Sequence, residues 1–205
     1  MKRLVFVIGI LTGTAALSAR TSQTNAGEVY ISEVMAKPGG LTAFPETEYV
    51  EIHNASNEAV ALGGWAFVYD RTTIALPDTV LPPGAYAVLF RTGRDIMVDD
   101  NGTAVPLANF PNALADDGKT LRIISPEGTA VDEVAYTRAT AARSWERDEA
   151  GEWYLSNDPR GGTPGAANSP ATPPPPPDDP SQPGDVIFSE VMANPTGLTG
   201  LAETE

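Results

Sequence analysis

The sequence predicts an all-β main domain that is built as a sandwich or a barrel. Three observations support this prediction. Short runs rich in β-branched and aromatic residues recur along the chain, and turn-forming clusters separate them roughly every 8–12 residues. No segment sustains the 3.6-residue apolar period of an amphipathic helix. Glycine and proline number 19 each, which is above average usage and indicates many turns.

The expected strands follow one another between recognisable turns, which read NASNE, LGG, LPPG, DDNG, ADDGK, SPEG and DEAG. In the second strand, Val50 and Ile52 are expected on one face, and Tyr49, Glu51 and His53 on the other. The stretch Thr92 to Leu114 is irregular and is expected to cap one end of the domain. The strands are expected at residues 29–34, 49–53, 60–62, 65–70, 73–76, 86–90, 120–124, 131–136, 144–146 and 153–155.

The first residues resemble a secretory signal peptide. Lys2 and Arg3 precede an apolar run from Leu4 to Leu11, and small residues follow. The run is too short to span a bilayer comfortably, although a short membrane anchor is the alternative. Cleavage is expected after Ala19 or Ala26.

An internal repeat indicates a tandem arrangement. Residues Glu28 to Glu48 align without gaps to Asp185 to Glu205, with 13 identities in 21 columns. The spacing of 157 residues is far longer than a solenoid repeat and corresponds to a whole domain. Because the second copy stops in its opening part, we expect the chain to be a fragment of a longer protein.

The predicted organisation therefore has four parts. They are a signal peptide (1–26), a β-sandwich domain (27–169), a Pro-rich linker (170–184) and the first strand of a truncated second domain (185–205). The run Pro173 to Pro177 favours an extended, semi-rigid spacer. A ligand for an aromatic groove is the alternative.

Charge and composition limit the classes of partner and of chemistry that the chain can support. The 27 acidic and 13 basic residues give a formal net charge of -14. This balance argues against binding to nucleic acid or anionic lipid, and favours cationic partners or divalent ions. The absence of cysteine excludes disulfides and thiolate chemistry within these residues, and the one histidine, His53, limits imidazole chemistry.

Six motifs follow one another along the chain: ISEVMA, ETEYVEIHNAS, VALGGWAF, LPPGAYAVLF, LADDGKTLRIISPEGTAVDEVAY and SWERDEAGEWYLSNDPRGGTPGAANS. This ordered set resembles the lamin tail domain, an immunoglobulin-like sandwich of nuclear lamins and many exported bacterial proteins. The set spans about residues 28–169. The resemblance implies an immunoglobulin-like fold and an accessory or interaction module, in some bacterial members attached to nucleases or phosphatases, with no common catalytic site.

Two sets of titratable residues are candidates for catalysis, and both are interpreted as non-catalytic. His53 would need a positioned partner to act as a general base, and the sequence supplies none, so a half-exposed strand residue is expected. Glu33, Glu46, Glu48 and Glu51 could form a glycosidase pair. Strand alternation instead predicts a solvated face for them.

Calcium is the one cofactor candidate. Asp95, Asp99, Asp100 and Asn101 precede a glycine in a loop rich in oxygen ligands. Their spacing does not match an EF-hand, and the same residue types form ordinary turns. The sequence Asp116-Asp117-Gly118 is interpreted as a hairpin turn.

The remaining candidates are aromatic residues and glycosylation sequons. Trp65, Trp145 and Trp153 could stack on sugars, but are expected to pack in the domain. The sequons at Asn54 and Asn101 lie in turns, where asparagine is common anyway.

The expected function is that of an exported, non-catalytic interaction module at the cell surface or outside the cell. The expected partner is an unknown extracellular protein or surface polymer. Nucleic acid is not expected for this domain alone, nor membrane contact after signal removal. The alternative is the accessory N-terminal module of a larger secreted hydrolase whose catalytic domain lies beyond residue 205.

Overall fold

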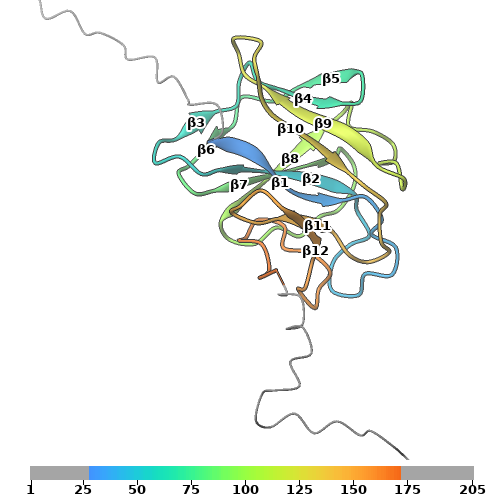
Figure 1. Ribbon diagram of the computed structural model, residues 1–205. Helices are drawn as coiled ribbons and strands as arrows, with labels where there is room; N and C mark the ends of the chain where they lie inside the picture. Colours follow the sequence, from blue (N-terminus) through green and yellow to red (C-terminus); the bar gives the residue numbers. More distant parts are fainter. Residues whose placement is uncertain (1–27, 172–205) are drawn as a thin grey trace, which may run out of the picture. The chain divides into compact units, whose positions relative to one another are not determined.

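A computed structural model describes residues 28–171 of the chain, which form an all-β sandwich (Figure 1). This confirms the predicted fold class. No helix in this range is long and apolar enough to cross a membrane. The strands are β1 (Val29–Met35), β2 (Tyr49–Asn54), β3 (Val60–Ala61), β4 (Ala66–Tyr69), β5 (Thr72–Ala75), β6 (Val80–Leu81), β7 (Tyr86–Arg91), β8 (Gly102–Leu107), β9 (Lys119–Ile124), β10 (Ala130–Tyr136), β11 (Trp145–Arg147) and β12 (Trp153–Leu155).

Two main sheets and one small ribbon hold these strands. The six-stranded sheet has the order β12-β11-β1-β2-β7-β8, and the four-stranded sheet has the order β10-β9-β4-β5. Strands β3 and β6 pair as a separate ribbon. All pairs are antiparallel except β7 with β8.

The hydrophobic core lies between the two sheets. Alternate residues of each strand point into it, including Ile31, Ile52, Phe67, Leu121 and Ile123, all with no exposed surface. Val50 and Ile52 belong to this core, as their predicted face requires. Each fully buried side chain of this size stabilises the fold by about 1.5–3 kcal/mol.

A bulge in β1 decides which residues face away from the core. Ile31 pairs with Ile52, and Glu33 pairs with Glu51, so Ser32 is an extra residue on β1. Consequently Tyr30 and Glu33 lie on the same face although they are three residues apart. This outer face of the six-stranded sheet carries the candidate site.

Ten of the twelve strands within residues 28–171 coincide with expected ones, and the two that were missed are β6 and β8. The stretch from Thr92 to Leu114 was predicted to be irregular, which is wrong for residues 102–107, because they form β8. Strand β8 lies at the sheet edge, parallel to β7. Pro106 lacks an N–H and obscures the strand in the sequence, but it is tolerated at an edge.

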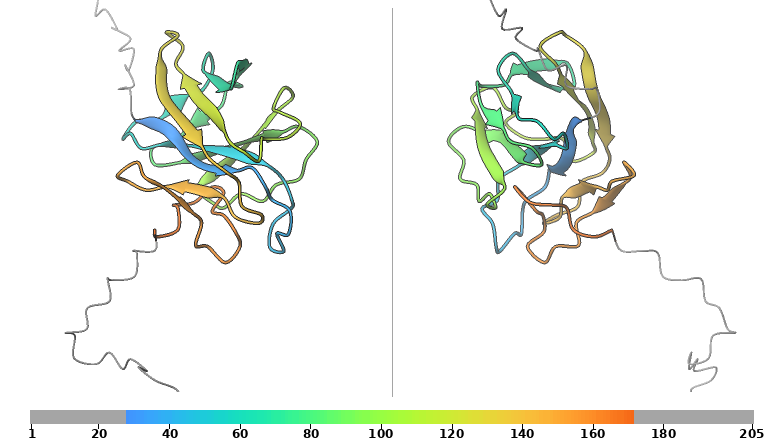
Figure 2. Two further views of the ribbon diagram at one scale, coloured as in Figure 1. Left: turned by 45° about the vertical axis from the view of Figure 1, so that its right-hand side comes forward. Right: turned by 90° about the vertical axis from the view of Figure 1, so that its left-hand side faces the viewer.

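A segment near the end of the domain covers part of the outer face. Residues 161–169, called the closing segment here, follow the β11–β12 hairpin (Figure 2). In Figure 1 the four-stranded sheet is at the top, β1 and β2 lie below it, and the closing segment is at the bottom in orange. The outer face is therefore partly buried rather than solvated.

Chain contacts divide the protein into two units, Met1–Ala171 and Thr172–Glu205. The predicted signal peptide, nearly all of the linker and the second repeat lie outside the described residues. These assignments stay predictions.

Candidate functional site on the outer sheet face

Strand pairing arranges the outer face into three rows of side chains. The glutamate row consists of Glu146, Glu33 and Glu51, which are paired neighbours on β11, β1 and β2. The aromatic row consists of Tyr30, His53 and Tyr86 on β1, β2 and β7. The apolar row consists of Met35, Tyr49 and Phe90 on the same three strands.

The glutamate row is fully buried beneath the closing segment, and none of its three residues has exposed surface. Main-chain N–H groups of this segment donate to the carboxylates: Thr163 to Glu33 at 2.9 Å, Gly165 to Glu51 at 2.6 Å and Ser169 to Glu146 at 2.8 Å. The predicted solvated face is therefore wrong for Glu33 and Glu51. Glu46 is exposed and Glu48 is half-buried.

Side chains complete the hydrogen bonding of this row. Tyr49 donates to Glu33 at 2.7 Å, and the hydroxyl of Ser32, the bulge residue, donates to Glu51 at 2.6 Å. The backbone of Gly162 lies so close that an added Cβ would be 2.6 Å from both Glu33 Oε1 and Tyr49 Oη. The row thus functions as an anchor for the closing segment.

Burial raises the pKa of two glutamates of this row. Desolvation and, second, the neighbouring charge of Glu146 raise the pKa of Glu33 to about 7. Desolvation and then the charge of Glu33 raise the pKa of Glu51 well above its usual value. Three carboxylates so close together cannot all ionise without repulsion. Because their oxygen atoms already accept hydrogen bonds from the fold, they are poorly placed to act on a substrate.

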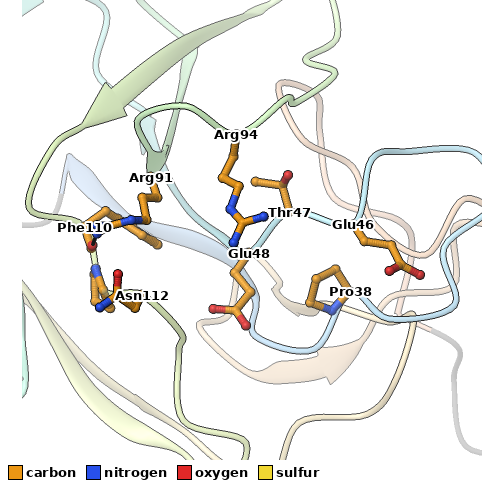
Figure 3. A pocket seen from close by; sticks show the side chains of 9 residues that line it. Pro38, Glu46, Thr47, Glu48, Arg91, Arg94, Phe110 and Asn112 are labelled. Carbon is orange, nitrogen blue, oxygen red and sulfur yellow. Dashed lines mark hydrogen bonds between the residues drawn. The ribbon is translucent and has the colours of Figure 1, made fainter.

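The apolar row is covered by residues around Leu41, Ile96 and Val98, which pack against it. A small cavity of about 90 Å³ lies nearby, beside Thr47, Glu48, Arg91 and Arg94 (Figure 3). We call it the arginine pocket.

Two charged side chains of the arginine pocket hold the chain between β7 and β9. Glu48 accepts from the Leu114 N–H at 2.5 Å, and Arg91 donates to the Phe110 carbonyl at 2.6 Å. Burial raises the pKa of Glu48, while the Leu114 N–H and Arg94 oppose this shift. Glu48 and Arg91 therefore have a structural role in this pocket.

The aromatic row differs from the other two because it lines an open cleft. His53 stacks on Tyr86 with ring centroids 4.3 Å apart, and meets Tyr30 edge to face at 5.3 Å. The Tyr30 hydroxyl and His53 Nδ1 are hydrogen-bonded at 2.9 Å. Burial lowers the pKa of His53, while a hydrogen bond with the Gly84 backbone opposes this shift.

The cleft has a volume of about 270 Å³ and is called the aromatic cleft here. The aromatic row lines it together with Tyr154, the hairpin residues 147–149 and the chain from Ala167 to Ala171. Arg147 lies over the Tyr30 ring at 5.3 Å and forms an ion pair with Asp132 at 3.1 Å. The cleft therefore combines flat aromatic surface with charged residues at its rim.

A family model described as Lamin Tail Domain matches residues 22–138, which is more than half of the chain. The chain belongs to the lamin tail domain family. No curated protein matches it. In this lamin tail domain, the match includes the aromatic row, Glu33 and Glu51, and ends before Glu146 and the closing segment.

Three of the four calcium candidates of the lamin tail domain are engaged in separate interactions, and the fourth, Asp100, is exposed. Asp99 pairs with Arg160 at 3.0 Å, and the Asn101 amide donates to the Gly84 carbonyl at 2.8 Å. The Asp95 carbonyl accepts from Thr47. Within residues 28–171, no group of three or more His, Cys, Asp or Glu side chains is arranged to hold a metal ion. The expectation is that no cofactor is bound, and calcium at these residues stays the untested alternative.

The tryptophans and one sequon have clear structural positions. Trp65 is buried in the core, and Trp145 and Trp153 pack against it from partly buried positions, as expected. Asn54 is fully buried, and its amide donates to main-chain carbonyls such as that of Leu81 at 3.0 Å. The folded domain therefore offers no free amide at this sequon.

The turn at Asp116-Asp117-Gly118 is confirmed, but it is not a hairpin turn. It connects β8 and β9, which belong to different sheets. The Gly118 N–H donates to the Ala115 carbonyl at 3.2 Å, and Lys37 pairs with Asp116 at 2.6 Å.

Sequence reasoning missed the aromatic row because its members are far apart in the chain. Residues 30, 53 and 86 become neighbours only once the registers of β1, β2 and β7 are known. The sequence did contain a signal for the aromatic row, because an aromatic or imidazole ring stands at an outward-facing position of each of the three strands. Pairing consecutive strands would have joined Tyr30 and His53, but not Tyr86, because β2 pairs with β7 rather than with the next strand of the chain.

Proposed function

We propose that this chain is an exported, non-catalytic binding module, carried in tandem, which contacts an extracellular partner through the aromatic cleft. The observation that carries the proposal is that, among residues 28–171, no segment covers this cleft, whereas other segments cover the glutamate row and the apolar row. Tyr30, His53 and Tyr154 line it with partly exposed rings. Aromatic surface with a few polar groups is typical of ligand sites.

The engagement of the titratable groups supports a binding role over a catalytic one. Buried carboxylates that could act as acid and base instead accept main-chain N–H groups of the closing segment. His53 is occupied by Tyr30 and stacked on Tyr86. A general base must reach the proton that it abstracts, and these contacts obstruct that.

The experiment measures binding of the full chain to a panel of soluble polysaccharides and peptides. Tyr30→Ala removes one ring of the cleft, and Tyr69→Ala removes a partly buried ring packed against the core, away from the cleft. We expect a ligand whose binding is weakened by the first variant and retained by the second. The proposal is contradicted if neither polysaccharides nor peptides bind, or if Tyr30→Ala leaves binding unchanged. Hydrolysis of phosphodiester or glycoside substrates by the chain would also contradict it.

A further inference from the structure

The glutamate row is a buried cluster of acids without a basic partner. None of its three side chains has exposed surface. Within residues 28–171, no lysine, arginine or histidine forms an ion pair with any of them. Buried carboxylates are costly when they are ionised and no cation is paired with them. The row is therefore expected to be neutralised by protons.

The hydroxyl group of Thr163 indicates where one such proton is held. Its Oγ1 lies 3.3 Å from Glu33 Oε2 and 3.2 Å from Glu146 Oε1. It also lies 3.2 Å from Asn168 Oδ1, which is fixed as an acceptor because the Asn168 amide nitrogen donates to two main-chain carbonyls. One hydroxyl hydrogen cannot serve three acceptors. The arrangement is satisfied when Glu33 or Glu146 carries a proton and donates it to Thr163.

The other side chains around the row leave its carboxyl groups as the ones that respond near pH 7. Burial raises the pKa of the four neighbouring tyrosines above 10, so they stay protonated. Burial lowers the pKa of His53, and its ring contacts the Tyr30 hydroxyl rather than the row. The closing segment has no titratable side chain. These neighbours are Tyr30, Tyr49, His53, Tyr86 and Tyr154, with the ion pair of Arg147 and Asp132 beside Tyr30.

The closing segment connects the row to the aromatic cleft. Residues 167–169 of this segment line the cleft together with residues 170–171. Ser169 donates both its N–H and its hydroxyl to Glu146 Oε2, and its carbonyl accepts from the Tyr154 hydroxyl. One wall of the cleft is therefore positioned by a carboxyl group of the row.

We infer that a proton held in the glutamate row locks the closing segment, and that loss of this proton frees one wall of the aromatic cleft. This inference rests on the proposed function and concerns its regulation. Burial and, second, the charge of Glu146 raise the pKa of Glu33 from 4.5 to about 7. An opened segment admits water to this carboxyl group, which then binds its proton less tightly. The lock is thus complete below about pH 4.5 and is lost as pH rises through about 7.

The first test measures amide hydrogen exchange of the full chain between pH 5 and 8 by NMR, corrected for intrinsic rates. Protection factors at Thr163, Gly165 and Ser169 should fall roughly ten- to hundredfold over this range, as loss of one such proton predicts. They should change little in dilute guanidinium, because opening a short segment exposes little surface. Glu33→Gln cannot lose this proton and should show a smaller dependence on pH.

The second test follows the wall of the cleft directly. The chain has no cysteine, so Ala167→Cys provides a single site for a pH-insensitive, environment-sensitive fluorophore at an exposed position of the closing segment. Its emission should change between pH 5 and 8 with a midpoint near 7, and Glu33→Gln should remove this midpoint. Val80→Cys is the matched control, because Val80 is exposed on the separate β3–β6 ribbon. Its emission should not change.

The outcomes separate this inference from the proposed function, because neither test needs a ligand. Constant protection factors and constant emission between pH 5 and 8 would overturn the lock and leave the binding module standing. An equal response of wild type and Glu33→Gln would also overturn it. Failure of the ligand panel contradicts the binding module alone. A panel ligand that binds equally well at pH 5 and 8 would overturn the link between the lock and the cleft.

Discussion

At the scale of single residues, Glu33 shows how a charged side chain is used inside this sandwich. It has no exposed surface, yet its carboxylate accepts hydrogen bonds from Tyr49 and Thr163. A buried acid with such partners stabilises the fold more when it is protonated, because desolvation penalises the charged form. The free-energy cost of burying the Glu33 carboxyl group therefore depends on pH.

Replacing Glu33 with Gln should alter the pH dependence of stability. The pKa of Glu33 rises from 4.5 to about 7 in the folded state, so the native protein binds the proton more tightly. Its stabilising contribution is complete below about pH 4.5 and is lost as pH rises through about 7. Melting temperatures of wild type and E33Q should differ least near pH 5, and E33Q should gain relative to wild type by pH 8.

The exposed variant Glu149→Gln is the control, and its curve should run parallel to wild type. The relative gain of E33Q is on the order of a few kcal/mol at most. Parallel curves for E33Q and wild type between pH 5 and 8 would show that Glu33 does not titrate in this window.

A second prediction at the residue scale concerns Gly162. Because glycine has no side chain, it permits the closing segment to approach the glutamate row. A Cβ at this position would lie 2.6 Å from Glu33 Oε1 and Tyr49 Oη. Gly162→Ala should therefore destabilise the domain by about 1–3 kcal/mol, as overpacking does. Gly39→Ala is the matched control, because nothing lies within 4 Å of its added Cβ. Equal denaturation midpoints for both variants would be inconsistent with this close contact.

At the scale of elements, strands were predictable from sequence where local alternation decides them. Val50 and Ile52 in β2 were placed correctly because a period of two requires no knowledge of other strands. The burial of Glu33 was not predictable in this way. Its main-chain partner, Thr163, is 130 residues away and reaches it only in the folded chain. The bulge at Ser32 depends on the pairing of β1 with β2, so it could not be predicted from the local sequence either.

The closing segment should be held firmly although it lacks regular secondary structure. The N–H groups of Thr163, Gly165 and Ser169 donate to buried carboxylates, as strand N–H groups donate to carbonyls. We expect slow amide hydrogen exchange at these three residues, measured by NMR and corrected for intrinsic rates. Exposed Ala167 is the internal reference and should exchange faster. Similar protection factors at all four positions would argue against the anchor.

At the scale of the whole molecule, the internal repeat retains residues of the anchor but differs at one position of the aromatic row. Ser189 and Glu190 stand where the first copy has Ser32 and Glu33, so the anchor residues recur. Ile187 stands where the first copy has Tyr30. The tandem layout stays a prediction, because the second repeat lies outside the described residues. That Tyr30 of the first copy belongs to the aromatic cleft became clear only from the fold.

One side chain joins the two sheets of the sandwich near the cleft. Asp132 lies on β10, the edge of the four-stranded sheet, and accepts from the Ile31 N–H of the other sheet at 2.8 Å. It also pairs with Arg147, and the side chains of the pair are 10% and 22% exposed. Removing one member of such a pair leaves a largely buried charge unpaired.

Asp132→Ala should therefore destabilise the whole domain by about 1–3 kcal/mol in chemical denaturation. The neighbouring variant Glu133→Ala is the control, because Glu133 pairs with Arg122 at 3.5 Å on an exposed surface. Such surface pairs contribute about 0–1 kcal/mol. Because Arg147 lies over Tyr30, Asp132→Ala should also change ligand binding in the cleft, whereas Glu133→Ala should not. If both variants lose the same stability, the link between the sheets does not depend on Asp132.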